Sequence, residues 1–301
     1  MVSAPADTCI NEFIQSLSTN EDLNQKTLRE YTSDLRNFAS WFEEIWGIHG
    51  EGSIHFHPSE ITTPTIVQYR EYLQKIRCLK PATVNRRLIT LKRYFDWAVG
   101  QDLVATDFSK PVKLIPEEKT SPRQITDKEE AALIAAAEKH GNVRDRTLLL
   151  VMLHTGLRSM EVCNLTVKDI TIGKRSGHIT VRGKRNKQRD VPLNSTARIA
   201  LEPYLASLPN GCEYLFPSEK TGGRLNERAL RRIVEKYARL AGLNGVSAHD
   251  LRHRFGYVMS EKTPLHRLAQ IMGHDSLNTT KVYVRATRAD LQAEVEKIAW
   301  Q

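Results

Sequence analysis

The stretch GHITVRGKRNKQRDVPL, residues 177–193, decides the fold class of this chain, because its apolar residues alternate with polar ones. Ile179 and Val181 precede a turn rich in glycine and lysine, and Val191 and Leu193 follow that turn. Alternation on both sides of such a turn is typical of a β-hairpin. A sequence that otherwise favours helices is therefore predicted to contain a small antiparallel sheet.

The predicted hairpin is strongly basic. From Lys174 to Asp190 the chain has seven basic residues and one acidic residue. This density is higher than that of an ordinary solvated surface, and it suits contacts with phosphate groups.

The segments on both sides of the hairpin show helical patterns. Upstream, TDKEEAALIAAAEKHG begins with Thr126 and, three residues later, Glu129, which together form a capping box. Two further helices are predicted within RDRTLLLVMLHTGLRSMEVCNL, and helices resume at LNERALRRIVEKYARLAGL. Residues 125–301 are therefore predicted to form a mainly α domain with a small antiparallel β-sheet, an α+β fold.

A separate all-α domain, a helical bundle, is predicted for residues 1–106. Apolar residues recur there every three or four positions, as they do on one face of a helix. The clearest stripes are Leu28, Tyr31, Leu35, Phe38 and Phe42, and then Val84, Leu88, Leu91, Phe95 and Ala98. The next segment, TDFSKPVKLIPEEKTSPRQIT, has three prolines and little periodicity, so residues 107–124 are assigned as a linker.

The composition favours a polyanionic partner. The 301 residues include 44 Lys and Arg against 35 Asp and Glu, a formal net charge of +9. Nucleic acid or an anionic membrane surface suits that charge, although simple solubility also accounts for it. The four cysteines form no C-x-x-C pair, no signal peptide is evident, and the apolar run TLLLVML is too short to span a bilayer. A cytoplasmic protein without a membrane segment is expected.

Two short clusters hold residues that are suited to chemistry. In TGLRSMEV, Arg158 and Glu161 are spaced so that the carboxylate can hold the guanidinium, or so that the two form an ordinary surface ion pair. In MGHDSLNTTKVYV, His274 is followed nine residues later by Tyr283. Taken alone, that tyrosine would be interpreted as a packing residue.

A third cluster, SAHDLRHRFG, has the histidine spacing of a zinc helix. His249 and His253 lie four residues apart, but Asp250 stands where that motif has glutamate, and Arg252 lies between the histidines. We therefore expect no metal here, and we expect His249 and Arg252 to offer hydrogen-bond donors to an anion. A histidine-rich loop near residue 50 is likewise interpreted as solvated and not as a metal site; its histidines are His49, His55 and His57.

Taken in order, these clusters resemble the motifs of the tyrosine recombinases, the phage-integrase family that includes the Xer chromosome-dimer resolvases. TGLRSMEVCNLTVKDI resembles T-G-L-R-x-x-E-L, and GKRNKQRDVPL resembles G-K-x-x-K-x-R-x-x-P-L. HDLRHRFG resembles H-x-L-R-H-x-F, and MGHDSLNTTKVYV resembles L-G-H-x-x-x-x-T-T-x-x-Y. KPATVNRRLITLKRYFDWAV is similar to the last helix of the family's N-terminal core-binding domain.

This resemblance implies a site-specific DNA recombinase that cleaves and rejoins strands through a covalent 3′-phosphotyrosyl intermediate, with no metal, ATP or other cofactor. A phosphodiester resists attack because its oxygens are negative, and paired arginines stabilise the charge that develops. The residues implied are Arg158 and Arg252 as the arginines, Lys184 as proton donor to the leaving oxygen, His249 as base, His274 as a phosphate-orienting residue, Tyr283 as nucleophile and Glu161 as support for the first arginine.

The chain departs from the family pattern at a few positions that are not catalytic. Arg254 and Gly256 stand where threonine or alanine, and alanine, are commoner. Met272 replaces leucine, and the histidine-bearing loop is longer than in compact members. An active enzyme is therefore expected.

The implied partner is a double-stranded DNA recombination site, bound by a dimer per site and a homotetramer on two paired sites, with no small-molecule substrate. The expected DNA contacts are Arg86, Arg87, Arg185, Lys187, Arg231 and Arg232, although an exposed helix face would also explain the arginines outside the hairpin. A stripe of Leu291, Val295 and Ile298 predicts a last helix that packs on its own domain or on a neighbouring protomer. The resemblance does not distinguish between DNA integration, transposon or plasmid resolution, integron recombination and chromosome-dimer resolution.

Two other functions share part of this sequence pattern. A type IB topoisomerase shares the tyrosine chemistry, but the Xer-like first domain and the compact length argue against it. A DNA-binding regulator on a recombinase scaffold has no need for a tyrosine beside two arginines and a lysine.

Overall fold

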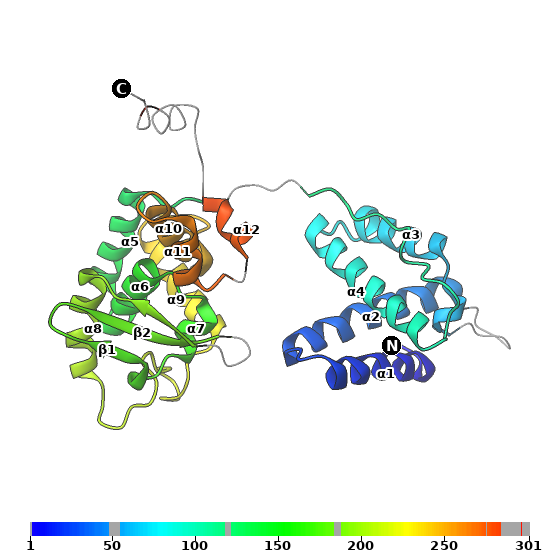
Figure 1. Ribbon diagram of the computed structural model, residues 1–301, viewed down its shortest axis with the longest axis horizontal. Coiled ribbons are helices and arrows are strands. Elements are labelled where there is room, and N and C mark those ends of the chain that lie inside the picture. The colour runs from blue at the N-terminus through cyan, green and yellow to red at the C-terminus, as the bar shows by residue number, and fades with distance from the viewer. Residues whose placement is uncertain are drawn as a thin grey trace. The chain divides into compact units, whose positions relative to one another are not determined.

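The computed structural model describes residues 2–47, 55–117, 122–183, 188–274 and 276–283, together with Glu296. The chain divides into two compact units, Met1–Lys119 and Thr120–Gln301 (Figure 1). Each unit has its own hydrophobic core. The predicted architecture, a helical first domain and a mainly helical second domain with a small antiparallel sheet, is confirmed.

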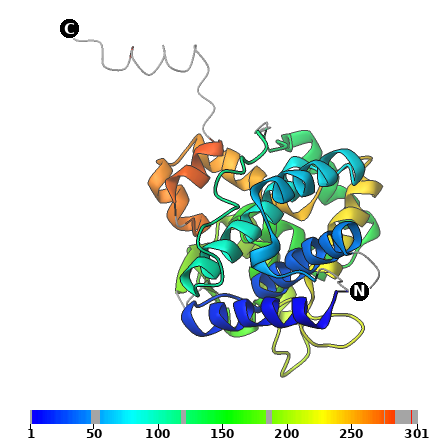
Figure 2. The ribbon, with the colours of Figure 1, turned by 90° about the vertical axis from the view of Figure 1, so that its right-hand side faces the viewer.

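The N-terminal unit is a helical bundle. Its helices are α1 (Ala4–Asn20), α2 (Gln25–Trp46), α3 (Thr63–Glu71) and α4 (Pro81–Gly100), with a 3-10 turn at Pro58–Glu60 and a π-helical turn at Tyr72–Ile76 that continues α3. In Figures 1 and 2, α1 (dark blue) lies along one edge of this bundle. The two predicted stripes face the core, since all their members are buried except the half-buried Tyr31.

Aromatic rings fill much of this core. The ring of Phe38 lies 5.8 Å from that of Phe56 and 4.9 Å from that of Tyr69, measured between centroids, in edge-to-face arrangements. The chain after α4 closes the core, because Val112 is buried and the side chain of Asn85 bonds the backbone of Ile115 at 2.8 and 2.9 Å. The first part of the proline-rich segment therefore packs on the N-terminal unit.

In the sequence, the helices of the C-terminal unit lie both before and after the strands of its sheet. They are α5 (Asp127–His140), α6 (Val143–Thr155), α7 (Ser159–Asn164), α8 (Ser195–Ser207), α9 (Glu227–Leu240), α10 (Ala248–Ser260), α11 (Leu265–Met272) and α12 (Leu277–Thr280), and a 3-10 turn, Lys281–Tyr283, follows α12. The predicted capping box at the start of α5 is present, with the backbone N–H of Thr126 donating to the Glu129 carboxylate at 2.8 Å.

The sheet has three antiparallel strands in the order β1 (Ile170–Ile172), β2 (Gly177–Arg182) and β3 (Gln188–Pro192). Ile179 on β2 lies opposite Val191 on β3, and both side chains are buried. The predicted hairpin is therefore confirmed. β1 was not predicted, because three residues are too few to show an alternation.

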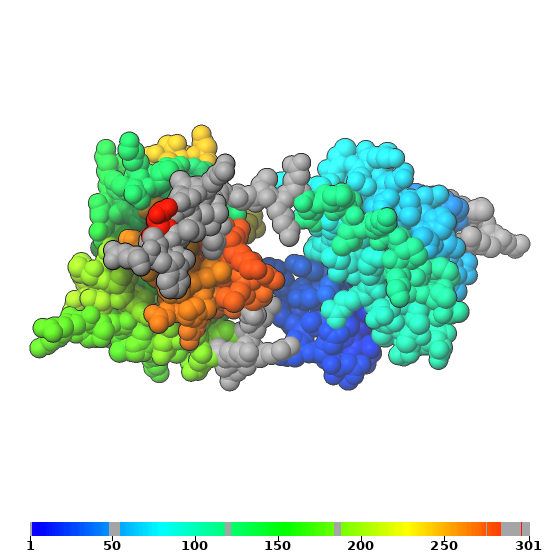
Figure 3. Space-filling model, turned by 45° about the horizontal axis from the view of Figure 1, so that its top comes forward, coloured from blue at the N-terminus to red at the C-terminus, as the bar shows by residue number. Residues whose placement is uncertain are grey.

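The core of the C-terminal unit forms around α6, whose residues 147–153 are all buried. α8 and α10 pack against this helix, and α6 therefore supports one face of α10. α11 and α12 lie at the surface of the unit, where they appear orange in Figure 3. None of the described helices is long and apolar enough to cross a bilayer.

Candidate active site

Three arginines meet at the C-terminal end of α11. The last carbonyls of a helix have no partner within the helix and carry the negative end of its dipole, so they attract cations. The carbonyls of residues 271–273 accept, in that order, from Arg189 Nε at 3.1 Å, Arg252 Nη2 at 2.9 Å and Arg158 Nη2 at 2.6 Å. This one helix end therefore gathers side chains from α10, from β3 and from the turn before α7.

Arg158 is positioned by a tight turn between α6 and α7. α6 ends at Gly156, whose φ of +63° is left-handed, and a Cβ atom there would lie 2.3 Å from the Phe255 ring. Arg158 then becomes the N-cap of α7, and its backbone N–H and its Nη1 donate to Glu161 at 2.8 and 3.0 Å. Its side chain is 44% exposed, so this guanidinium is accessible to a ligand.

Arg252 is the buried arginine of the pair, with 3% of its surface exposed. It donates to the carbonyls of Gly156 and Met272 and, at 2.8 Å, to His274 Nε2. Burial, followed by the charge of Arg158, lowers the pKa of Arg252 to about 10, so the side chain is still a cation at neutral pH. These hydrogen-bond partners are neutral, and its charge is therefore available to an anion.

Glu161 holds Arg158 in place, and Arg189 in turn holds Glu161. Arg189 Nη1 and Nη2 donate to the two carboxylate oxygens of Glu161 at 2.9 and 3.0 Å. Burial favours a raised pKa for Glu161, but the hydrogen bonds from Arg189 and from the backbone of Arg158 outweigh it and lower the pKa. Arg189 was not among the predicted site residues, although it occupies the arginine position of the hairpin motif quoted above.

His274 follows α11 and contacts Arg252. Because the guanidinium can only donate, Nε2 of His274 accepts, and Nδ1 therefore carries the proton that it shares with Thr280 Oγ1 at 2.7 Å. Burial and the neighbouring arginines, Arg252 first, lower the pKa of His274 to about 4. In this structure His274 bonds the arginine that was predicted to bind phosphate.

Tyr283 is buried against α10, with 4% of its surface exposed. Its hydroxyl lies 3.0 Å from His253 Nδ1, and Ser260 Oγ donates to its backbone carbonyl at 3.1 Å. The ring lies over Gly256, where a Cβ atom would be 2.5 Å from the phenol carbon Cζ. Burial raises the pKa of Tyr283, and the charges of Arg252 and Arg158 partly offset that rise.

His249, one turn before His253, lies on the same part of α10. The two imidazole rings are in edge contact, with centroids 4.3 Å apart. Although His249 is partly exposed to solvent, desolvation of its ring, followed by the charge of Arg252, lowers its pKa below the ordinary histidine value. Within the described ranges, the hydroxyl of Tyr283 bonds His253 and not the predicted base His249.

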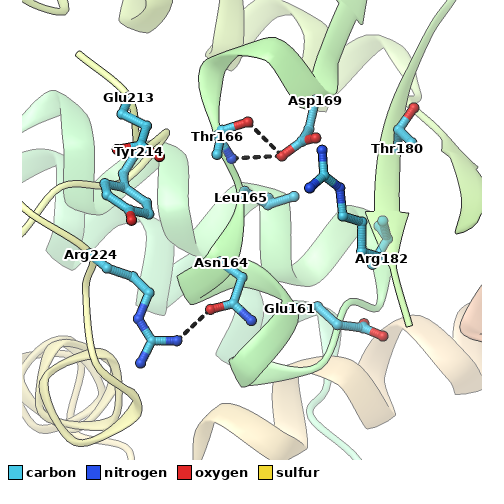
Figure 4. A pocket seen from close by; sticks show the side chains of 11 residues that line it. Glu161, Asn164, Leu165, Thr166, Asp169, Thr180, Arg182, Glu213, Tyr214 and Arg224 are labelled. Carbon is cyan, nitrogen blue, oxygen red and sulfur yellow. Dashed lines mark hydrogen bonds between the residues drawn. The ribbon is translucent and has the colours of Figure 1, made fainter. Parts of the chain in front are cut away.

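The basic turn of the hairpin, with Lys184, Arg185 and Lys187, lies outside the described residues. At its base, between α7, β2 and the loop before α9, is a cavity of about 290 Å³. Arg182 and Arg224 extend into this cavity from opposite walls, and Glu161 lies at its edge (Figure 4). The cavity is therefore next to the carboxylate that holds Arg158.

The arginines predicted to contact DNA have different surroundings. Arg86 pairs with the buried carboxylate of Asp34 at 2.5 Å, and Arg87 Nε lies 3.7 Å from the same carboxylate. Arg231 and Arg232 are exposed on α9, and neither forms an ion pair with any residue that the structure describes. Leu291, Val295 and Ile298 of the predicted last helix lie outside the described residues.

The site can bind a phosphate and offer it a nucleophile. The site contains the guanidinium groups of Arg158 and Arg252, neutral imidazoles and one phenol. These groups come from the turn before α7, from α10 and from the chain that follows α11. Among the described residues no cluster of His, Cys, Asp or Glu has the arrangement of a metal site, and His57 of the histidine-rich loop bonds Ser59.

Comparisons with known proteins agree with the family resemblance of the sequence motifs. Residues 123–290 match the sequence profile of the phage integrase family, and residues 10–102 match that of the phage integrase N-terminal SAM-like domain. The chain is 33% identical to the tyrosine recombinase XerA of Pyrococcus furiosus over 96% of this chain and 95% of that protein. It is 28% identical to the tyrosine recombinase XerC of Thermodesulfovibrio yellowstonii over 95% and 93%, respectively.

Two solved structures share its fold. XerH bound to its difH substrate, in a pre-cleavage complex, superposes with a TM-score of 0.74 at 21% identity, over 97% of this chain and 95% of that one. The Tn1549 transposon integrase in complex with transposon right-end DNA superposes with a TM-score of 0.76 at 16% identity, over 96% and 99%.

Proposed function

The chain belongs to the phage integrase family and is a tyrosine recombinase, and we propose that Tyr283 is the nucleophile with which it cuts and rejoins duplex DNA. The family works through a covalent phosphotyrosine, so one tyrosine must reach a phosphate that cations hold. The observation that supports Tyr283 is its position beside α10, where the nearby charges of Arg252 and Arg158 partly offset the rise in its pKa that burial causes.

The two arginines are proposed to bind the non-bridging oxygens of the scissile phosphate. Arg158 is exposed and Arg252 is buried, so the phosphate would enter from the side of Arg158 and meet both guanidinium groups. Planar guanidinium groups match phosphate geometry and stabilise the negative charge of the transition state. His274, bonded to Arg252, would orient that arginine toward the phosphate.

In the proposed reaction, the phenolic oxygen of Tyr283 bonds to phosphorus while the bond from phosphorus to the 5′-oxygen breaks. The 5′-oxygen leaves with a proton from Lys184, and the hydroxyl proton of Tyr283 goes to an imidazole of α10, where His249 was the expected base. Attack of a 5′-hydroxyl from a partner strand on the phosphotyrosine reverses both proton transfers. The phosphotyrosyl bond keeps the energy of the broken phosphodiester bond, so strands are rejoined without ATP.

The substrate is proposed to be a duplex recombination site in the cytoplasm, bound by one dimer and paired with a second site in a tetramer. XerH and the Tn1549 integrase, which share this fold, were solved with DNA. Exposed Arg231 and Arg232 on α9 suit phosphate contacts. Arg86 and Arg87 are held by Asp34, so their proposed contacts would depend on that carboxylate.

A suicide substrate tests the proposed function. Duplex DNA from the region that flanks the protein's own gene, nicked next to the cleavage position, lets the cleaved end diffuse away and traps the covalent intermediate. Wild type is expected to form a protein–DNA adduct that survives denaturant, and Tyr283→Phe is expected to form none while still binding the DNA. An adduct of equal yield in the Phe variant would refute Tyr283 as the nucleophile.

A further inference from the structure

We infer that His253 is a further catalytic residue, the hydrogen-bond acceptor that directs the hydroxyl of Tyr283 during DNA cleavage. This inference rests on the proposed function, since it concerns the same nucleophile. Its starting point is the 3.0 Å contact between His253 Nδ1 and the Tyr283 hydroxyl. A residue in that position touches the atom that bonds to phosphorus.

The packing of the Tyr283 ring orients its hydroxyl toward His253. Gly256 has no side chain, and the ring lies over it; the edge of the ring meets Tyr257, with centroids 5.3 Å apart. Ser260 fixes the backbone of Tyr283 one turn further along α10. With ring and backbone both fixed, the hydroxyl points to His253, which is one turn before Tyr257.

The chemistry of His253 suits an acceptor. A neutral imidazole has one nitrogen with a free lone pair, and a phenol is a good donor to it. Burial, followed by the neighbouring His249, lowers the pKa of His253 to about 4, so the ring is neutral at pH 7. A phosphate anion bound nearby would favour a positive imidazole, and thus would strengthen the pull on the tyrosine proton as the substrate enters.

The i,i+4 spacing of His249 and His253 resembles that of a zinc helix, and the structure gives that spacing another use. His249 and His253 lie edge to edge, and only His253 meets the hydroxyl among the described residues. The pair therefore offers one imidazole to the nucleophile and a second behind it. Proton balance is kept, because the proton that leaves Tyr283 moves along its existing bond to Nδ1.

The test compares cleavage rates of two substitutions at this position. His253→Asn keeps an acceptor, because Asn Oδ1 sits on Cγ just as Nδ1 does, whereas His253→Phe keeps the ring shape and removes the acceptor. The rates are measured on the suicide substrate and on one in which sulphur replaces the leaving 5′-oxygen. A thiolate leaves without a proton, so this second substrate bypasses Lys184 and reports on the nucleophile alone.

We expect His253→Phe to cleave both substrates at least about tenfold more slowly than wild type, and His253→Asn to fall between the two. DNA affinity and melting temperature should change little. His266→Phe, an exposed histidine on α11, is the matched control and should cleave like wild type. If His253→Phe fails to fold, His253→Ala replaces it, and added imidazole should restore part of its cleavage.

The outcomes separate this inference from the proposed function. A wild type that forms no adduct with either substrate would contradict the proposed function itself. With an active wild type, the inference is overturned if His253→Phe cleaves as fast or faster, if Asn is no better than Phe, or if imidazole leaves the Ala variant unchanged.

Discussion

Glu161 determines how both of its arginine neighbours are held. Its carboxylate accepts two parallel hydrogen bonds from Arg189 and two more from Arg158, one from the backbone N–H and one from the side chain, and it is 8% exposed. A buried carboxylate is costly unless it is paired on several sides, and removal of one partner leaves the charge uncompensated. The ion pair first predicted from TGLRSMEV is therefore part of a three-residue cluster and not a surface pair.

Removal of Arg189 should therefore destabilise the C-terminal unit. We expect Arg189→Ala to lower the free energy of unfolding by about 2–4 kcal/mol, because Glu161 would keep its charge and lose two bonds. Cleavage should fall as well, since Arg158 would lose part of its support. Urea unfolding followed by circular dichroism measures the first effect.

Arg146 provides the matched control for that measurement. It pairs with Glu138 at the surface, where the side chains are 38% and 51% exposed. Arg146→Ala should change stability by less than about 0.5 kcal/mol. Equal small effects from both substitutions would contradict the role assigned to Arg189.

Residue-level contacts across long sequence separations were the least predictable part of the site. Arg189 bonds a carbonyl 82 residues away and a carboxylate 28 residues away, and no local pattern encodes either contact. The motif resemblance placed an arginine at that position without giving its partner. Likewise, Gly256 was noted as a departure, but its purpose is visible only where the Tyr283 ring lies over it.

At the scale of elements, the end of α11 organises the site. Its last carbonyls meet three arginines, and the left-handed Gly273 lets the chain turn there toward His274. A Cβ atom on Gly273 would lie 2.7 Å from the Arg189 guanidinium, so glycine is needed at this position for close packing as well as for the turn. The helix dipole and the arginines stabilise one another.

α10 is also tied to the start of its own unit. Arg254, one of the departures noted from sequence, pairs with Glu130 on α5 at 2.6 Å and also with Asp127. Tyr257 donates to the carbonyl of Pro122 at 3.2 Å. The helix that carries His249, Arg252 and His253 is thus fixed to α5 and to the end of the proline-rich linker.

The hairpin between β2 and β3 is predicted to supply the general acid. Lys184→Ala should slow cleavage of ordinary DNA by roughly 10²–10⁴-fold, because the 5′-oxygen is a poor leaving group without a proton. The same variant should cleave the substrate in which sulphur replaces the leaving 5′-oxygen at nearly the wild-type rate. Single-turnover rates on both substrates check this, and a loss of equal size on the two would mean that Lys184 does not act as the acid.

Local patterns were sufficient to predict most elements. The spacing of apolar residues gave the buried faces of α2 and α4, and alternation gave β2 and β3. β1, with three residues, has no pattern of its own and forms because β2 offers a free edge. The packing of Val112 and Ile115 on the N-terminal unit depends on distant partners, so a proline-rich segment that looked like plain linker is partly structural.

At the scale of the whole molecule, the proposed function assigns DNA binding to both units and the chemistry to the C-terminal unit. The N-terminal unit has an aromatic core and a buried Asp34 that holds two arginines. The C-terminal unit contains every described residue of the proposed reaction. Because its site contains half-buried histidines whose pKa values are lowered, the stability of this unit should depend on pH.

The direction of that dependence follows from the lowered pKa values. His253 and His274 titrate near 4 in the folded protein and near 6.5 when unfolded, so between these values the unfolded chain binds more protons. Stability is therefore full above about pH 6.5 and is lost as the pH falls toward 4. After allowance for partial exposure, each histidine should contribute about 1 kcal/mol of loss between pH 7 and pH 5.

Urea unfolding at the two pH values measures this loss. His253→Asn has no group that titrates there, so its loss between pH 7 and pH 5 should be smaller than that of wild type by about 1 kcal/mol. A wild type that is equally stable at both values would contradict the neutral state assigned to these imidazoles.

The most direct test of the central claim is to locate the covalent bond in the trapped adduct by mass spectrometry. Trypsin should cut after Lys281 and Arg285 and release VYVR, residues 282–285, which contains Tyr283 as its one nucleophilic side chain. After nuclease digestion, the mass of a 3′-linked nucleotide is expected on this peptide and on that tyrosine. A nucleotide on any other residue, or an unmodified VYVR peptide from purified adduct, would contradict the account.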